Sequence, residues 1–187
     1  LSLTLLILIT YLYKKFVIDA AMLCDINVYL NSKKIPVNNI SQYSKLYDNI
    51  SDNSITIKSD NSIVLLTPSN TFENISFVNG VYTRLGGQHV DSWSESFFRP
   101  IVKKINKPKK PQVNIKDVKQ FFRLFVVSTV IRPEFDGQDK NKLEMPSVPS
   151  TVKTSHINSI MKWPVISNIE DIIKSKYPKC NFKIYIF

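Results

Sequence analysis

The sequence is poor in the residues that build disulfides, metal sites and phosphate-binding loops. Its 187 residues include only two cysteines, two histidines and four glycines. Cys24 and Cys180 lie far apart and form no Cys-x-x-Cys pair, which excludes a disulfide framework and favours a reducing compartment. These cysteines are also too widely separated from His89 and His156 to predict a zinc site. No Gly-x-Gly or Walker-type loop is present, so a complete phosphate-binding loop is excluded.

A long apolar segment is missing as well. Leu1–Leu12 is apolar, but Lys14 and Lys15 interrupt the run before it reaches the roughly 20 residues that cross a bilayer. The run has neither the basic start nor the small-residue cleavage site of a signal peptide. We therefore expect no membrane segment, but a helix buried against a neighbouring domain. The chain begins without Met, and we expect it to be part of a longer polypeptide.

Basic residues, in contrast, are plentiful. There are 25 Lys and Arg against 15 Asp and Glu, a formal net charge of +10. Hydrophobic residues make up 43% and charged residues 21%, which is typical of globular proteins and excludes wholesale disorder. The positive charge favours a polyanionic partner such as nucleic acid, a nucleotide or an anionic membrane. A domain that is merely basic is the alternative.

Alternating and continuous apolar runs predict seven strands. The run Phe121–Ile131 is apolar almost throughout, as expected for a strand buried on both faces. Three runs between residues 54 and 83 are typical of an antiparallel meander. The predicted strands are Cys24–Asn31, Ile35–Val37, Ser54–Lys58, Ser62–Thr67, Phe72–Thr83, Phe121–Ile131 and Phe182–Phe187.

Helical spacing of apolar residues predicts five further helices after the first one. Pro100 lies inside one of them, where we expect a kink or a break. Arg132–Ser150 is rich in proline and predicts a long loop, and such loops are usually functional. The predicted helices are Ile40–Tyr47, Val90–Ile105, Val113–Lys119, Thr154–Lys162 and Val165–Lys176. The order of elements predicts an α+β fold, a mixed sheet with helices packed on one face.

Five segments of the sequence, taken in order, resemble eukaryotic-type (type IIA) DNA topoisomerase II. The most specific pair reads Ile-Ser-Phe-Val-Asn-Gly at 75–80 and Gly-Gly-Gln-His-Val-Asp at 86–91. The others are Asn27–Asn31 with Lys34–Pro36, Ile101–Lys107, and Pro133–Lys140. The matching part of the family is the transducer domain, which follows the GHKL nucleotide-binding domain in the ATPase gate. The resemblance implies a fold like the second domain of ribosomal protein S5, with residues 1–22 as a helix linking to a GHKL domain and 23–187 as the transducer.

The resemblance also implies a role for the loop at Pro133–Lys140. In the family, a loop Gln and Lys reach the terminal phosphate of ATP, and the matching residues are Gln138 and Lys140. Asp139 departs from the family, which usually has Thr there, and we expect its carboxylate to point away from the phosphate. Lys142 is off the motif and is interpreted as a surface residue. From the residues alone, an ordinary solvated loop remains the alternative.

A run of lysines gives the second candidate site. The family has a lysine-rich loop facing DNA, and Lys103, Lys104 and Lys107 match it. Lysines on a proline-interrupted loop contact phosphates without reading sequence. The alternative is a solvated run of charges that binds nothing.

The sequence predicts that the chain alone is catalytically inactive. His89 and Asp91 are two positions apart on a predicted helix and do not face each other, so they form no catalytic dyad and His89 is interpreted as structural. Trp93, Phe97 and Phe98 are interpreted as core residues. The resemblance implies ATP and Mg²⁺ as cofactors of the intact enzyme, with Mg²⁺ bound outside this chain, and no metal site within it.

The first functional hypothesis is therefore the transducer of an ATP-dependent type II DNA topoisomerase, which couples ATP binding and hydrolysis to strand passage. Double-stranded DNA, ATP and a second copy of the enzyme are its implied partners. We expect a nuclear location for a cellular enzyme, and the viral factory in the host cytoplasm or the virion for a viral one. The alternatives are a free-standing basic nucleic-acid-binding module with an S5-like fold, and the equivalent domain of a mismatch-repair or chaperone relative.

Overall fold

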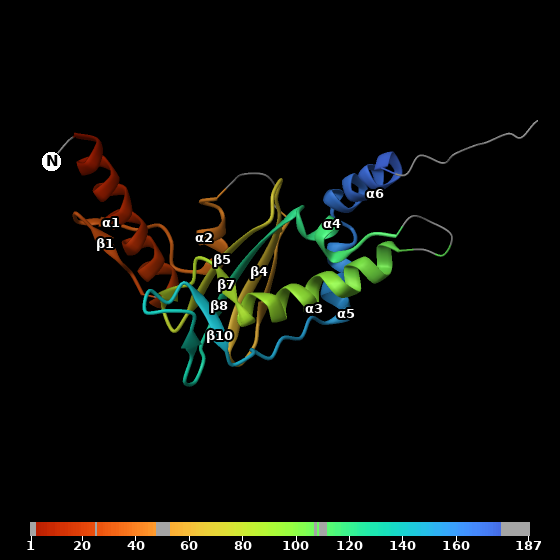
Figure 1. The fold of residues 1–187 in the computed structure, drawn as a ribbon. Coiled ribbons are helices and arrows are strands. Elements are labelled where there is room, and N and C mark those ends of the chain that lie inside the picture. Colours follow the sequence, from red (N-terminus) through yellow and green to blue (C-terminus); the bar gives the residue numbers. More distant parts are fainter. Residues whose placement is uncertain (1–2, 25, 48–52, 107, 109–111, 177–187) are drawn as a thin grey trace, which may run out of the picture.

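A five-stranded mixed sheet lies at the centre of the fold. It is seen in a computed structural model that describes residues 3–24, 26–47, 53–106, 108 and 112–176. The sheet lies in the middle of Figure 1, and its strands follow the order β3-β4-β8-β5-β6. Their bounds are Ile55–Lys58 (β3), Ser62–Pro68 (β4), Glu73–Val78 (β5), Val81–Tyr82 (β6) and Phe122–Ser128 (β8).

The strand predicted to be buried on both faces occupies the middle of this sheet. β8 pairs with β4 in the antiparallel sense and with β5 in the parallel sense. Its Leu124 and Val126 belong to one core cluster and Phe125 to the other, which explains its continuous apolar sequence. The hairpin β3–β4 was predicted correctly, but the simple meander was wrong, because β8 inserts between β4 and β5.

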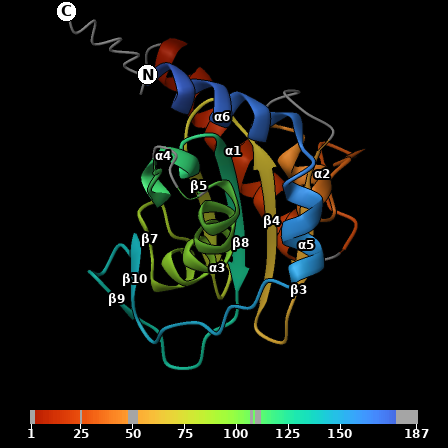
Figure 2. The same cartoon turned by 90° about the vertical axis from the view of Figure 1, so that its right-hand side faces the viewer.

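Four helices and the larger core cluster cover one face of the sheet. α3 is amphipathic and buries Trp93, Phe97 and Phe98 completely, as predicted. It continues through Pro100 without the expected break. Figure 2 shows α3 and α5 in front of the sheet, on the viewer's side. The bounds are Gln88–Ile105 (α3), Ile115–Lys119 (α4), Thr154–Ile160 (α5) and Pro164–Lys176 (α6).

The other face carries a smaller core and shorter helical segments. α2 (Ile40–Ser44) covers it together with the last turn of α1 (Leu3–Cys24), from which Met22 joins the core. The strand predicted at Cys24–Asn31 is reduced to β1 (Tyr29–Leu30), because α1 extends to Cys24. β1 forms a hairpin with β2 (Lys33–Lys34). The predicted α+β class with a mixed sheet is confirmed, and helical segments lie on both of its faces.

A second sheet of three short strands forms where a long loop was predicted. It has the order β7-β10-β9, with bounds Gly86–Gly87 (β7), Glu134–Phe135 (β9) and Lys142–Met145 (β10). β7 pairs with β10 in the parallel sense, and β9 with β10 in the antiparallel sense. The prediction of a loop over Arg132–Ser150 was therefore wrong in part. The strand predicted at Phe182–Phe187 lies outside the described residues.

The first helix projects away from the rest of the chain (Figure 1). It buries only Asp19, Ala21 and Met22, while most of its apolar side chains are exposed. None of the helices in the described part of the chain combines the length and apolar character needed to span a membrane.

Candidate functional site

The residues predicted to contact a phosphate lie in the turn between β9 and β10. Asp136 closes this turn, because its backbone N–H donates to the carbonyl of Lys142 (3.1 Å) and its carboxylate Oδ1 accepts from the backbone N–H of Lys142 (3.0 Å). Within the turn, the backbone N–H of Lys140 donates to the carbonyl of Gly137 (3.1 Å). The turn therefore has a defined backbone and is not an open loop.

The side chains of Gln138 and Lys140 are exposed at the tip of this hairpin. The Lys140 Nζ lies 5.8 Å from the centre of the Phe135 ring and forms no ion pair with the described residues. Lys140 has a left-handed backbone (φ 54°), a conformation that glycine or asparagine adopts more readily than lysine. The structure thus brings both predicted residues into one exposed turn.

Asp139 interacts locally within the same turn. Its carboxylate accepts a hydrogen bond from the side-chain amide of Asn141. Lys142, which was interpreted as a surface residue, is exposed and lies 3.6 Å from the Glu144 carboxylate. Lys140 and Lys142 therefore differ in their surroundings although they are only two positions apart.

The glycine pair of the Gly-Gly-Gln-His motif anchors this hairpin to the start of α3. Gly87 pairs with Leu143, and a Cβ atom at Gly87 would collide with the Leu143 backbone. Gly87 also has φ 119°, a conformation that side chains rarely adopt. In addition, the Leu85 N–H donates to the Asn141 carbonyl (2.9 Å). The motif is thus explained by the close approach of two backbones directly before the helix begins.

His89 is a structural residue in the first turn of α3. It is fully buried, with Nε2 3.1 Å from the Thr83 hydroxyl, which in turn lies 2.7 Å from the Ser76 hydroxyl. Burial lowers the pKa of His89 to about 4, so the imidazole is neutral at pH 7. Asp91 is exposed and is not a partner of His89. This agrees with the interpretation that the two residues form no dyad.

The predicted basic site lies at the opposite end of α3. Lys103 and Lys104 are exposed in its last turn and form no ion pair with the described residues. Lys107, the third predicted residue, lies outside the described residues. An 18-residue helix is about 27 Å long, so the two candidate sites are connected by one rigid element but are not brought together.

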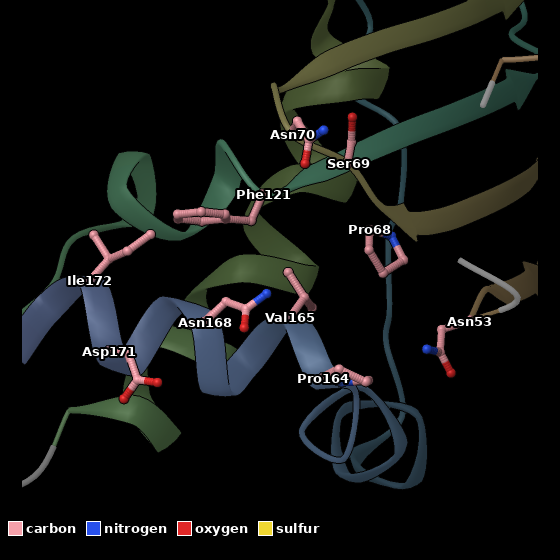
Figure 3. Close-up of a pocket in the computed structure, with 10 residues that line it drawn as sticks. All are labelled: Asn53, Pro68, Ser69, Asn70, Phe121, Pro164, Val165, Asn168, Asp171 and Ile172. Carbon is pink, nitrogen blue, oxygen red and sulfur yellow. The ribbon is translucent and has the colours of Figure 1, made fainter. Parts of the chain in front are cut away.

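A cavity that the sequence did not predict lies between α6 and the end of β4. It has a volume of about 560 Å³, and Figure 3 shows Asn168 and Ile172 on the side of α6 that faces Phe121. None of the described residues that line it is a lysine, arginine or histidine, so it offers no cationic side chain to a phosphate. The lining residues are Asn53, Pro68, Ser69, Asn70, Phe121, Pro164, Val165, Asn168, Asp171 and Ile172.

Comparison with known proteins places the chain in a family. The family model described as DNA gyrase B matches residues 24–174. The chain is 37% identical over 182 residues to DNA topoisomerase 2 of Invertebrate iridescent virus 6, covering 88% of this chain and 16% of that protein. It is 33% identical over 141 residues to DNA topoisomerase 2 of Acanthamoeba polyphaga mimivirus, covering 71% and 11%. The chain therefore spans less than a fifth of the length of these relatives.

Solved structures support the same assignment. The ATPase region of Saccharomyces cerevisiae topoisomerase II matches with a TM-score of 0.75 and 26% identity, over 85% of this chain and 43% of that one. The fold is also similar to the ATPase and transducer domains of DNA topoisomerase II from Balamuthia mandrillaris, with a TM-score of 0.76 and 24% identity over 87% of this chain and 43% of that one. The chain belongs to the DNA gyrase B family, which includes the ATPase regions of type II DNA topoisomerases.

Proposed function

We propose that this chain is the transducer segment of an ATP-dependent type II DNA topoisomerase, in which it couples ATP binding and hydrolysis to DNA strand passage. The observation that carries the proposal is the arrangement around α3. One end of this helix is joined through Gly87 and Leu143 to the turn of Gln138 and Lys140, and the other end presents Lys103 and Lys104. The likeness to viral DNA topoisomerase 2 over 88% of the chain supports the same function.

In this proposal, Lys140 and Gln138 contact the γ-phosphate of ATP held by another domain. An ammonium group without a carboxylate partner among the described residues is available to a phosphate, and the Gln amide can donate a second hydrogen bond. The left-handed backbone of Lys140 is a further argument. A lysine in that conformation costs about 1 kcal/mol relative to glycine, so its side chain is expected to serve a purpose beyond the turn itself.

ATP and Mg²⁺ would act in the intact enzyme rather than in this chain. The described residues contain no cluster of three or more His, Cys, Asp or Glu side chains that could hold a metal ion. We propose that Mg²⁺ and the adenine are bound by the GHKL domain, as the family resemblance implies. The role left to this chain is to place a positive charge beside the terminal phosphate, where phosphoryl transfer is governed by positioning and charge stabilisation.

The pairing of Gly87 with Leu143 offers a route for coupling. A displacement of the phosphate-contacting turn would pull on β10, and β10 pairs directly with the two residues that precede α3. Because the buried face of α3 is closely packed against the central sheet, we expect the helix to move as a unit. Its far end carries the lysines proposed to contact DNA.

Lys103, Lys104 and Lys107 are the residues proposed to contact double-stranded DNA. The exposed Lys103 and Lys104 side chains form no ion pair with the described residues, so no internal interaction must be broken before they bind phosphates. We expect contacts with the DNA backbone and no preference for sequence.

Residues 1–22 are proposed to be the helix that joins the transducer, residues 23–187, to the GHKL domain. The exposed apolar surface on the first turns of α1 supports a contact with another domain, because such a surface usually marks an interaction site, although α1 itself continues to Cys24. We propose that the intact enzyme works as a homodimer. Relatives occur in viruses and eukaryotes, and we propose the nucleus for a cellular enzyme and the viral factory or virion for a viral one.

The test compares Lys140→Ala with Lys142→Ala in the full-length enzyme. Loss of a charge-assisted hydrogen bond to the γ-phosphate is worth roughly 1.5–3 kcal/mol, which corresponds to about a 10- to 100-fold lower rate. Steady-state ATPase and relaxation of supercoiled plasmid at saturating ATP should both fall by this factor in Lys140→Ala. Gln138→Ala should show a milder loss. If Lys142→Ala lost ATPase and relaxation activity while Lys140→Ala kept both, the assignment of the phosphate contact would be wrong.

A further inference from the structure

A groove between the second half of α3 and the start of α4 lies beside the basic site. Its volume is about 580 Å³, and its lining residues are Arg99, Val102, Asn114, Ile115 and Lys116. Two of these residues are cationic and two are apolar. Lys103 lies one helical turn beyond Arg99, so Lys103 and the groove share one side of α3, whereas Lys104 lies about 100° further round the helix.

Side-chain hydrogen bonds fix the shape of this groove. The amide of Asn106 donates to the Val113 carbonyl (2.9 Å) and accepts from the Val113 N–H (2.8 Å), which fixes the approach to α4 beside the end of α3. Asn114 and Asp117 then start α4 with a reciprocal capping box. The groove is therefore preformed by contacts within the chain.

Positive charge dominates the rim of the groove. Lys116 lines the groove and Lys103 lies one turn of α3 beyond Arg99, and both are exposed and form no ion pair with the described residues. Two carboxylates lie nearby: Asp117 accepts the Asn114 N–H (2.9 Å) in the capping box, and Glu95 binds Arg99 through Nε (3.0 Å) and Nη2 (2.6 Å). The Arg99–Glu95 pair is a solvent-exposed i, i+4 pair, with 76% and 49% of the two side chains accessible. Such pairs are weak, so Arg99 can exchange Glu95 for a stronger partner at little cost.

We propose that this groove holds one sugar–phosphate strand of duplex DNA and extends the proposed DNA contact from Lys103 and Lys104 to Arg99 and Lys116. The planar Arg99 guanidinium suits two hydrogen bonds to one phosphate, and Lys116 supplies a second cation across the groove. Half-buried Val102 and Ile115 offer an apolar surface to the deoxyribose between the phosphates. The inference rests on the DNA part of the proposed function. It adds the expectation that removing the Glu95 carboxylate strengthens DNA binding, because Glu95 competes with DNA for Arg99.

The test measures binding of the 187-residue chain to a fluorescein-labelled 20-base-pair duplex by fluorescence anisotropy at several salt concentrations. Lys116→Ala should weaken binding roughly fivefold at about 0.1 M salt, and it should lower the slope of log K against log salt by about 0.9. Glu95→Gln should tighten binding, because it removes the carboxylate that occupies Arg99. Lys58→Ala is the matched control: Lys58 is likewise an exposed lysine, on edge strand β3, and should leave the slope unchanged.

The outcomes separate the groove from the wider proposal. If Lys103→Ala with Lys104→Ala lowers the salt slope but Lys116→Ala and Glu95→Gln do not change binding, the groove is not a DNA site and the proposed function stands. If the lysine pair also has no effect, the DNA part of the proposed function fails together with the groove. An effect of Lys58→Ala equal to that of Lys116→Ala would overturn the inference as well, because binding would then depend on total charge alone.

Discussion

α1 and α3 are the two longest helices in the described part of the chain, but only α3 is stabilised mainly by this domain. α3 has 18 residues and buries eight of them against the central sheet and its neighbours. α1 has 22 residues and buries only three, all in its last two turns. Leu3, Leu6, Leu8 and Phe16 of α1 are each more than half exposed. This chain alone therefore leaves most of the apolar surface of α1 uncovered, and its contact with another domain stays a proposal.

A buried polar cluster connects the last part of α1 to the central sheet. The Asp19 carboxylate accepts hydrogen bonds from the Tyr43 hydroxyl (2.6 Å) and the Lys15 ammonium (2.5 Å). The Tyr43 hydroxyl also lies 3.0 Å from that of Tyr47, and the Lys15 Nζ lies 4.2 Å from the centre of the Tyr82 ring. Burial raises the pKa of Tyr43 above its usual range, so the phenol stays protonated and donates to Asp19. This cluster is the joint between α1 and the rest of the domain.

The sharpest test of the contrast makes the same substitution in both helices. Ile101→Ala in α3 removes a side chain with no exposed surface and should lower the free energy of unfolding by about 2–5 kcal/mol. Ile7→Ala in α1 affects a side chain that is 48% exposed and should cost no more than about 0.5 kcal/mol in this chain. Urea unfolding followed by circular dichroism measures both. Equal losses would mean that α1 is packed within this chain.

The second prediction concerns pH and the buried imidazole at the start of α3. His89 has a pKa of about 4 in the folded chain and about 6.5 when unfolded, so the unfolded state takes up a proton first as the pH falls. The free energy of unfolding should therefore decrease between pH 6.5 and pH 4 by up to about 3 kcal/mol. His89→Gln cannot titrate, and the comparison of its pH profile with that of the parent chain isolates this contribution. Parallel profiles would contradict the role of burial.

The smallest effect is expected at the joint. Tyr43→Phe removes a donor to the buried Asp19 carboxylate, but Lys15 remains, so we expect a loss of about 1–2 kcal/mol. Amide hydrogen exchange should also become faster in the last two turns of α1. Tyr29→Phe is the control, since Tyr29 is 60% exposed and should be neutral. No change in exchange for Tyr43→Phe would show that the apolar contacts of Ile18, Met22 and Leu23 hold α1 without this hydrogen bond.

Local patterns in the sequence were sufficient to predict several elements. The spacing of Trp93, Phe97 and Ile101 predicts α3 because one helical face supplies most of the core. The continuous apolar run predicts β8 because this strand is central and covered on both faces. The first turns of α1 are exposed in this chain, so the predicted burial of this helix against a neighbouring domain stays a prediction.

Pairing between distant segments was not predictable from the same patterns. β7 and β9 have two residues each, too few for any periodicity, and the contact of Gly87 with Leu143 joins positions 56 residues apart. The insertion of β8 between β4 and β5 is also non-local. For Gln138 and Lys140, the local pattern was equally compatible with an ordinary solvated loop. Their proposed contact with the phosphate came from the family resemblance. Arg99 and Lys116 were missed because they line one groove from two different helices.

The most direct test of the central claim asks whether ATP covers Lys140. In the full-length enzyme, an amine-reactive label should modify Lys140 and Lys142 when no nucleotide is present, because both side chains are exposed. A non-hydrolysable ATP analogue should protect Lys140 but not Lys142, and ADP should protect neither, since it lacks the γ-phosphate. Peptide mass spectrometry measures the two sites separately. Equal labelling of Lys140 with the ATP analogue and with ADP would contradict the proposed contact with the γ-phosphate.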